Sequence, residues 1–142
     1  MVTYHRRVRL EEIDVAQIVF FARYYAYANE AMELLCEELD GTYVGYITQR
    51  KLCFATVKMA CEFSASLRYG DTVDIAVTVA RLGTKSATLV YHLTRGDGVA
   101  SAVITHTVVS FDIAAGASCA MPQDARAMFE RHLVSGCDAR TD

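Results

Sequence analysis

Residues 18–39 read IVFFARYYAYANEAMELLCEEL and carry the longest helical pattern in the chain. Apolar side chains recur there at three- and four-residue steps, the spacing of one face of an α-helix. The first turns are apolar nearly all round, and acidic side chains appear only from Glu30 onward. This pattern predicts a helix that is buried in a core and needs apolar cover on most sides. Asp40 and Gly41 then mark its end.

Strand-like segments precede and follow this helix. Residues 3–10 alternate loosely, and residues 11–17 are polar, so we expect a strand and then a loop in which Glu11 and Glu12 are solvated charges. Four later segments are rich in Val, Thr, Ile and Ala and are separated by turn signals: residues 52–67, 72–82, 86–94 and 99–112. Short connections between long strands indicate antiparallel hairpins. Pro122 opens a short closing helix.

A sheet that curls around one central helix satisfies this order of elements. The sequence therefore predicts an α+β protein with the hotdog fold, in which a curved antiparallel sheet wraps around one long helix. The length suits a single domain over residues 1–142. An ordinary α+β sandwich, with the helix on one face of the sheet, is the alternative.

Composition argues against several classes of protein. The formal net charge is −3, whereas nucleic-acid-binding proteins carry a basic stripe. The first residues lead into the charged stretch at Arg6 and Arg7 rather than into an apolar signal core, and no apolar run approaches the roughly 20 residues that span a bilayer. The five cysteines form no CxxC pair, and no histidine has a partner at metal-ligand spacing, so we expect no disulfide framework and no metal. Reduced cysteines suit a cytoplasmic protein.

The segment DVAQIVFFARY, from Asp14 to Tyr24, resembles the signature of the 4-hydroxybenzoyl-CoA thioesterase family. That signature is an acidic residue, a small residue or proline, Ala, Gly, two aliphatic residues, aromatics, and an Asn or similar residue before a Tyr. Later pieces resemble the family in the same order: residues 68–71, 105–112 and 121–122. Two positions depart from it, because Gln17 replaces Gly and Phe21 replaces the Tyr or His of many relatives. The resemblance implies a hotdog enzyme that hydrolyses an acyl-CoA thioester to the free acid and CoA.

Thioester hydrolysis needs a carboxylate beside the carbonyl carbon and donors aimed at the developing oxyanion. The resemblance gives these roles to Asp14, as nucleophile or general base, and to the Phe21 backbone N–H at the positive end of the helix. From spacing alone, Asp14 is better explained as a helix cap. Glu30 is a second candidate, because another branch of hotdog thioesterases uses a helix glutamate. Its alternatives are a partly buried Glu held by a polar neighbour and a helix-surface charge at the edge of a dimer.

The remaining candidate residues bind substrate. Aromatic side chains at the helix start are expected to hold the acyl group, and the resemblance places the CoA phosphates on a cationic turn, although exposed turn cations are ordinary. These substrate-binding candidates are Phe20, Tyr24, Tyr25, Asn29, Arg81, Lys85 and Ser86. No cofactor is expected, because coenzyme A is part of the substrate. The acyl group cannot be read from the sequence.

A single hotdog subunit leaves a sheet edge open, and pairing two copies edge to edge covers it. We therefore expect a homodimer or a homotetramer built as a dimer of dimers. Three other functions stay open: an acyl-carrier-protein thioesterase of a biosynthetic pathway, a non-catalytic acyl-CoA-binding protein, and a hydratase or dehydratase. The last needs a histidine beside Asp14. His92 and His106 are expected to face solvent or a partner strand, so only an unexpected approach of His106 would supply it.

Overall fold

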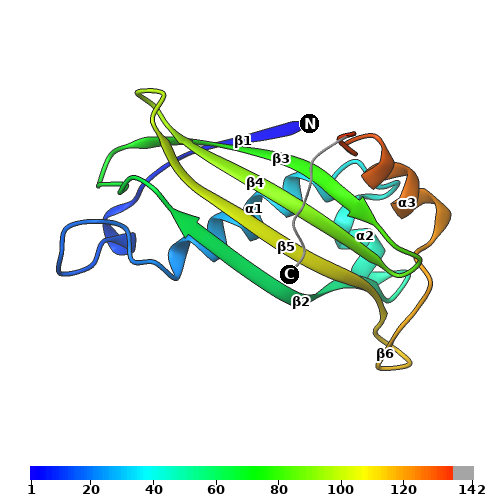
Figure 1. The fold of residues 1–142 in the computed structure, drawn as a ribbon. Coiled ribbons are helices and arrows are strands. Elements are labelled where there is room, and N and C mark those ends of the chain that lie inside the picture. The colour runs from blue at the N-terminus through cyan, green and yellow to red at the C-terminus, as the bar shows by residue number, and fades with distance from the viewer. Residues whose placement is uncertain (136–142) are drawn as a thin grey trace.

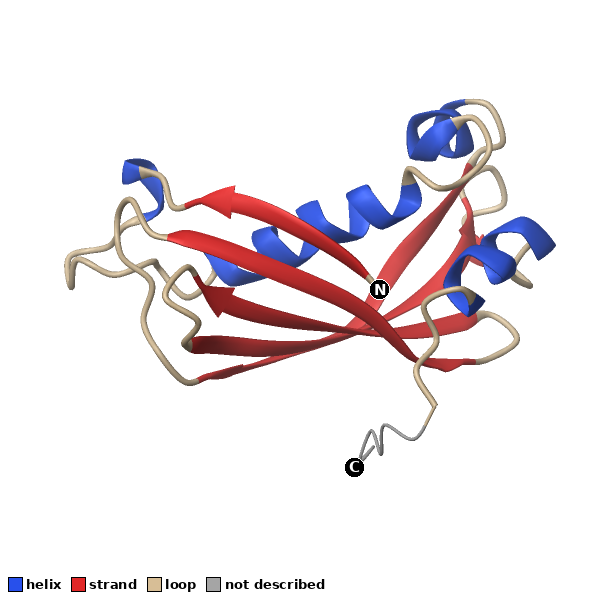
Figure 2. Cartoon of the chain, turned by 90° about the horizontal axis from the view of Figure 1, so that it is seen from above, coloured by secondary structure: helices blue, strands red, loops and turns tan. Residues whose placement is uncertain are grey.

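The computed structural model describes residues 1–135, and Cys137 lies outside them. The elements follow in the order β1 (Val2–Arg7), a 3-10 helix (Leu10–Glu12), α1 (Arg23–Cys36), α2 (Thr42–Thr48), β2 (Leu52–Phe63), β3 (Thr72–Leu82), β4 (Ser86–Arg95), β5 (Ala100–Asp112), β6 (Ala117–Ser118) and α3 (Gln123–Glu130). The strands form one antiparallel sheet in the order β1-β3-β4-β5-β2, with β6 beside β5. Helix α1 runs along one face of this sheet (Figure 1), and the sheet curves around that side (Figure 2). The predicted hotdog fold is confirmed.

The core lies between α1 and the concave face of the sheet. Seven helix residues are buried there: Tyr24, Tyr27, Ala28, Ala31, Met32, Leu35 and Cys36. Alternate residues of the strands meet them, among them Ile75, Leu89 and Ile104, which are fully buried. The opposite face of α1, with Ala26 and Asn29, is exposed. The helix is therefore covered on one side, and the prediction of apolar cover on most sides is wrong.

Helix α1 begins at Arg23 and not at the predicted Ile18. Before it, the Val19 amide donates to the Leu67 carbonyl and the Phe20 amide to the Glu12 carbonyl, both at 2.9 Å. These bonds to distant segments replace the helical ones.

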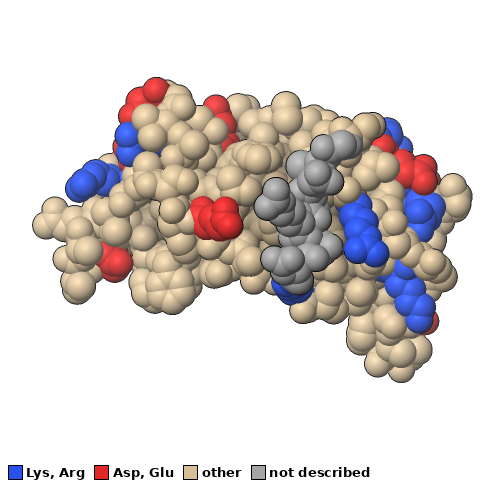
Figure 3. All heavy atoms as spheres, viewed as in Figure 1, with Lys and Arg blue, Asp and Glu red and all other residues tan. Residues whose placement is uncertain are grey.

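The other differences from the predicted elements are smaller. Helix α2 was not predicted, whereas α3 follows Pro122 as expected. No helix within residues 1–135 is long and apolar enough to cross a membrane. On the face seen in Figure 3, Lys and Arg side chains gather toward the two ends of the sheet, and most of the visible middle is uncharged.

Candidate active site

Asp14 opens a tight turn ahead of α1. Its amide donates to the Ile18 carbonyl at 2.9 Å, and its carbonyl accepts the Gln17 amide at 3.0 Å. A β-bridge between Ile13 and Val19 closes the loop. Gln17 has a φ of 63°, the left-handed conformation that a three-residue hairpin loop requires and that glycine adopts most easily. The glutamine that replaces the family's glycine therefore keeps the turn, at a cost in backbone strain.

The Asp14 side chain is held by the same turn. Its Oδ1 accepts the Ala16 amide at 2.8 Å, and among residues 1–135 no donor contacts Oδ2. The N-cap of α1 is Ala22, which makes no side-chain capping bond. Asp14 does not cap the helix, so that explanation of it is wrong. One carboxylate oxygen is fixed and the other is available for chemistry.

Two backbone amides are free where α1 begins. The Phe20 amide donates to Glu12 and the Arg23 amide to the Phe20 carbonyl. The amides of the two residues in between, Phe21 and Ala22, donate to no backbone carbonyl within the described chain. Unpaired amides at the positive end of a helix are an anion-binding arrangement. They provide what a developing oxyanion needs.

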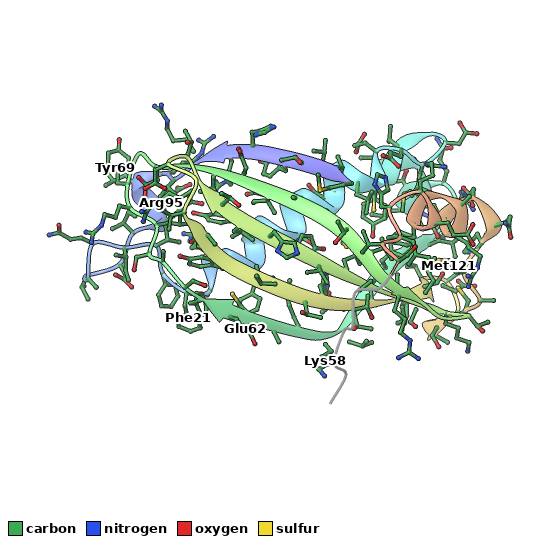
Figure 4. The ribbon with its side chains drawn as sticks, turned by 45° about the horizontal axis from the view of Figure 1, so that its top comes forward. Phe21, Lys58, Glu62, Tyr69, Arg95 and Met121 are labelled. Atoms are coloured by element: carbon green, nitrogen blue, oxygen red, sulfur yellow. The ribbon has the colours of Figure 1, made fainter. Side chains whose placement is uncertain are left out.

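A cavity of about 310 Å³ joins the carboxylate to the helix start. It is lined from one side by Asp14, Ile18, Val19, Phe20, Phe21 and Tyr24, and from the other by Phe63, Ser64, Ala65 and Ser66. The Tyr24 and Phe63 rings meet edge to face at 4.9 Å, and burial raises the pKa of Tyr24. Phe21, 58% exposed, marks this end of the molecule in Figure 4, and Met121 lies at the opposite end. The mouth of the cavity is therefore aromatic and open.

The second wall of the cavity was not predicted from sequence. The amides of Ser64 and Ala65 donate to the Ser101 carbonyl of β5, and Ser101 Oγ donates back to the Ala65 carbonyl at 2.7 Å. These bonds hold the segment after β2 beside the Asp14 turn. The two wall hydroxyls, Ser64 and Ser66, have no sequence signal beyond their place at a strand end.

Three of the predicted helix residues lie away from this cavity. Tyr25 and Asn29 do not line it. Glu30 turns toward β1, where its Oε2 lies 3.1 Å from Arg6 Nε, an ion pair without hydrogen-bond alignment. The arrangement of Glu30 matches the first of the alternatives given for it, a partly buried carboxylate held by a neighbour.

The predicted phosphate-binding residues also lie elsewhere within one subunit. Arg81, Lys85 and Ser86 occupy the β3–β4 turn, whereas the cavity lies at the end where β3 begins. The length of β3 separates the two ends by about 33 Å at the usual rise per strand residue. One chain does not bring these residues to Asp14.

Glu12 was predicted to be a solvated loop charge, and this prediction is wrong because the residue is buried. Its side chain is only 6% exposed, and that of its partner Arg6 is 8% exposed. The sequence did not reveal this burial because the two partners of Glu12 are far from it along the chain. Arg6 lies 6 residues before it and Tyr27 lies 15 residues after it, and no local sequence pattern pairs such positions. Glu11 is exposed, as predicted.

His106 also differs from its prediction, because it is buried on the concave face. Its Nε2 is hydrogen-bonded to Thr56 Oγ1 at 2.8 Å and its Nδ1 to the Tyr91 hydroxyl at 3.0 Å. Burial lowers its pKa. It lies about 13 Å along β5 from Ala102, which pairs with the cavity residue Phe63. With both nitrogens engaged, it is no proton-transfer partner for Asp14, which counts against the hydratase alternative.

No group of three or more His, Cys, Asp or Glu side chains within residues 1–135 is arranged to hold a metal ion. The cavity is lined by the Asp14 carboxylate and by the start of α1, where the amides of Phe21 and Ala22 are unpaired. Together with a sheet curled around a helix, they define a hotdog hydrolase. Residues 8–129 match the family described as the Thioesterase-like superfamily. The chain belongs to this superfamily, and it is a thioester hydrolase.

Individual relatives agree with this assignment. The structure of a gentisyl-coenzyme A thioesterase is 30% identical, with a TM-score of 0.81 over 90% of this chain and 99% of that one. A 1,4-dihydroxy-2-naphthoyl-CoA hydrolase from Nostoc punctiforme is 26% identical over 106 residues, 75% of this chain and 72% of the relative. A thioesterase superfamily structure from Jannaschia sp. is 23% identical, with a TM-score of 0.86 over 94% of each chain, and shows the fold alone. The resemblance is thus confirmed for the superfamily, and these relatives do not carry the 4-hydroxybenzoyl-CoA name.

Proposed function

We propose that this protein hydrolyses an aromatic acyl-CoA thioester to the free acid and CoA, with Asp14 as the catalytic carboxylate. The observation that carries the proposal is that Asp14 lines the same cavity as Phe21, whose amide is unpaired. A carboxylate and an oxyanion donor on one cavity are the two groups that acyl transfer to water requires.

In the proposed reaction the thioester oxygen accepts the Phe21 amide, with the Ala22 amide beside it. Asp14 Oδ2 then either removes a proton from the water that attacks the carbonyl carbon or attacks that carbon itself. The C–S bond breaks and the thiolate leaves, taking up a proton to give CoA. In the second route water cleaves the resulting anhydride and restores Asp14. Either way, one thioester and one water give one acid and one thiol, and no cofactor is needed.

The aromatic substrate class is supported by the cavity lining and by the relatives. Four rings, those of Phe20, Phe21, Tyr24 and Phe63, surround a space of about 310 Å³. Aromatic pairs favour an offset or edge-on partner, and a flat acyl group supplies one. Ser64 and Ser66 add hydroxyls that suit ring substituents. The named relatives act on gentisyl-CoA and on 1,4-dihydroxy-2-naphthoyl-CoA, which are both hydroxylated aryl thioesters.

The proposal includes a homodimer paired along β2. This strand is the last in the sheet, and its Val57 and Phe63 are 59% and 51% exposed. Antiparallel pairing of two β2 edges covers these side chains. It also brings the far end of the second subunit, with its β3–β4 turn, toward the cavity of the first. Arg81 and Lys85 then act on CoA phosphates across the interface, which explains their distance from Asp14 in one chain. The protein works in the cytoplasm, where its thiols stay reduced and CoA is available.

A panel assay tests the function. Thiol release is measured with benzoyl-, gentisyl-, 1,4-dihydroxy-2-naphthoyl-, butyryl- and octanoyl-CoA, and with benzoyl-loaded acyl carrier protein. We expect the aryl-CoA members to give the highest kcat/KM. Preference for the loaded carrier protein would shift the assignment to a carrier-protein thioesterase. Binding of aryl-CoA without thiol release would make the chain a non-catalytic binder.

A single turnover in H₂¹⁸O separates the two roles of Asp14. Label found in the Asp14 carboxylate after one turnover identifies it as the nucleophile, because water then cleaves the anhydride at the enzyme's carbon. A control with Asp14→Asn reports background exchange.

A further inference from the structure

One buried carboxylate next to the cavity has no part in the chemistry described so far. Glu12 precedes Asp14 by two residues, and its side chain is 6% exposed without touching the cavity. Burying a charge is costly unless every part of it is paired. The partners of the Glu12 carboxylate indicate the structural role of this buried charge.

The Glu12 carboxylate connects three elements. Arg6 of β1 donates to both of its oxygens, at 3.0 and 2.9 Å. The Arg9 amide donates to Oε1 at 2.8 Å, and the Tyr27 hydroxyl of α1 donates to the same oxygen at 2.9 Å. Burial opposes ionisation, but these donors outweigh it, so the pKa of Glu12 lies below its ordinary value. The residue is a fixed anion between strand, loop and helix.

Arg6 completes the cluster from β1. Its guanidinium lies 4.0 Å from the centre of the Tyr27 ring, and its Nε pairs with Glu30. The Arg6 side chain is only 8% exposed, and Tyr27 is fully buried in the core. Glu12 is thus attached to groups that cannot move without disturbing the sheet and the helix.

The backbone of Glu12 acts on the site directly. Its carbonyl accepts the Phe20 amide at 2.9 Å. That bond pairs the amide just before Phe21, whereas the amides of Phe21 and Ala22 remain free. The position of Glu12 therefore determines which amides of the turn into α1 are paired and which are left free, and it sets the near end of the hairpin that carries Asp14.

We infer that Glu12 is a positioning residue: anchored by Arg6 and Tyr27, it holds the Asp14 turn and the Phe21 amide in register with each other. The inference rests on the proposed function and concerns the same cavity. Misplacement of a catalytic group by about 1 Å can cost about a hundredfold in rate. An oxyanion donor acts mainly in the transition state, so its displacement lowers kcat more than it raises KM.

The test compares Glu12→Gln with Glu11→Gln, a matched change at the exposed neighbour. Benzoyl-CoA is the substrate, and rates are taken per folded protein, well below each melting temperature. We expect Glu12→Gln to lower kcat by about 10- to 100-fold with KM within about threefold of wild type, and Glu11→Gln to match wild type. Tyr27→Phe keeps the ring and removes one donor, so a smaller loss of kcat is expected. It serves as the second variant should Glu12→Gln not fold.

A spectroscopic readout separates positioning from stability. In an Asp14→Asn background, bound benzoyl-CoA labelled with ¹³C at the thioester carbonyl reports its hydrogen bond as a lowered C=O stretching frequency. Adding Glu12→Gln, or Tyr27→Phe if that is the variant that folds, should move the frequency back toward the value in buffer. A variant that only destabilises the fold leaves the frequency unchanged.

The two proposals fail in different ways. If the wild-type chain releases no thiol from any aryl-CoA, the proposed function is wrong. If the wild type is active while the folded Glu12 and Tyr27 variants keep its kcat and carbonyl frequency, the role of Glu12 alone is overturned.

Discussion

Replacing Gln17 with glycine should stabilise the protein without changing its activity. Gln17 stands in the left-handed region with φ of 63°, and its side chain is exposed. Its backbone amide makes the turn bond to Asp14, which glycine can make equally well. The substitution therefore removes strain and loses no buried contact.

The size of the effect follows from two opposing terms. A residue with a Cβ pays roughly 1–2 kcal/mol in the left-handed conformation, which glycine avoids. Glycine also gives the unfolded chain more freedom, which costs about 0.4–1 kcal/mol. The difference between these ranges lies between about 0 and 1.6 kcal/mol, and their midpoints give a gain of about 0.8 kcal/mol in the free energy of unfolding, which for a chain of this size raises Tm by about 3 °C.

Gln17→Ala is the matched control, because alanine keeps the Cβ and removes the rest of the side chain. Urea unfolding followed by circular dichroism gives the free energies of both variants, and thiol release gives kcat. We expect the alanine variant to stay within about 0.5 kcal/mol of wild type. A glycine variant no more stable than the alanine variant would show that the backbone strain at position 17 does not exceed the entropy cost of glycine, about 0.4–1 kcal/mol.

Three further predictions concern the core, the interface and the phosphates. Burial lowers the pKa of His106, so the unfolded chain binds a proton more readily than the folded one. The wild-type protein should therefore lose stability as pH falls below about 6.5. Urea titrations between pH 7 and 5 should show a smaller loss of stability for His106→Gln. Val57→Asp places two like charges, one from each subunit, along the proposed β2 pair, so light scattering should show a monomer. A variant that remains a dimer would show that the interface is not formed by β2. The double variant Arg81→Ala with Lys85→Ala should raise KM for benzoyl-CoA and weaken the dependence of KM on salt. It should leave kcat unchanged, because contacts to the phosphates are the same before and during the reaction at the carbonyl.

The apolar helix, the alternating strands and their turn signals predicted the order of elements, and the family resemblance favoured the hotdog fold over a sandwich. The ranges of β3, β4 and β5 agree with the predicted segments to within a residue or so, because alternation and turns are local properties. The start of α1 was not predictable in this way. Phe20 and Phe21 continue a helical pattern, but the Phe20 amide is taken by Glu12. A hydrogen bond between segments overrides local preference there.

The site residues also differ in whether a local sequence pattern could reveal them. Asp14 and Phe21 came from a motif, and the cavity contains both. Glu12 and the Ser64–Ser66 wall were missed because their roles depend on partners that only the folded chain brings near. Arg81 and Lys85 were assigned by resemblance; within one subunit they lie at the far end of the sheet, and their role stays a prediction that depends on the proposed pairing of two subunits.

The most direct test of catalysis by Asp14 is the turnover of Asp14→Asn. Asparagine keeps the oxygen that accepts the Ala16 amide, so the turn and the cavity should persist. We expect kcat for thiol release from benzoyl-CoA to fall by about a thousandfold, with the melting temperature and the Kd for the thioester nearly unchanged. A folded Asp14→Asn protein that hydrolyses benzoyl-CoA at the wild-type rate would contradict the mechanism.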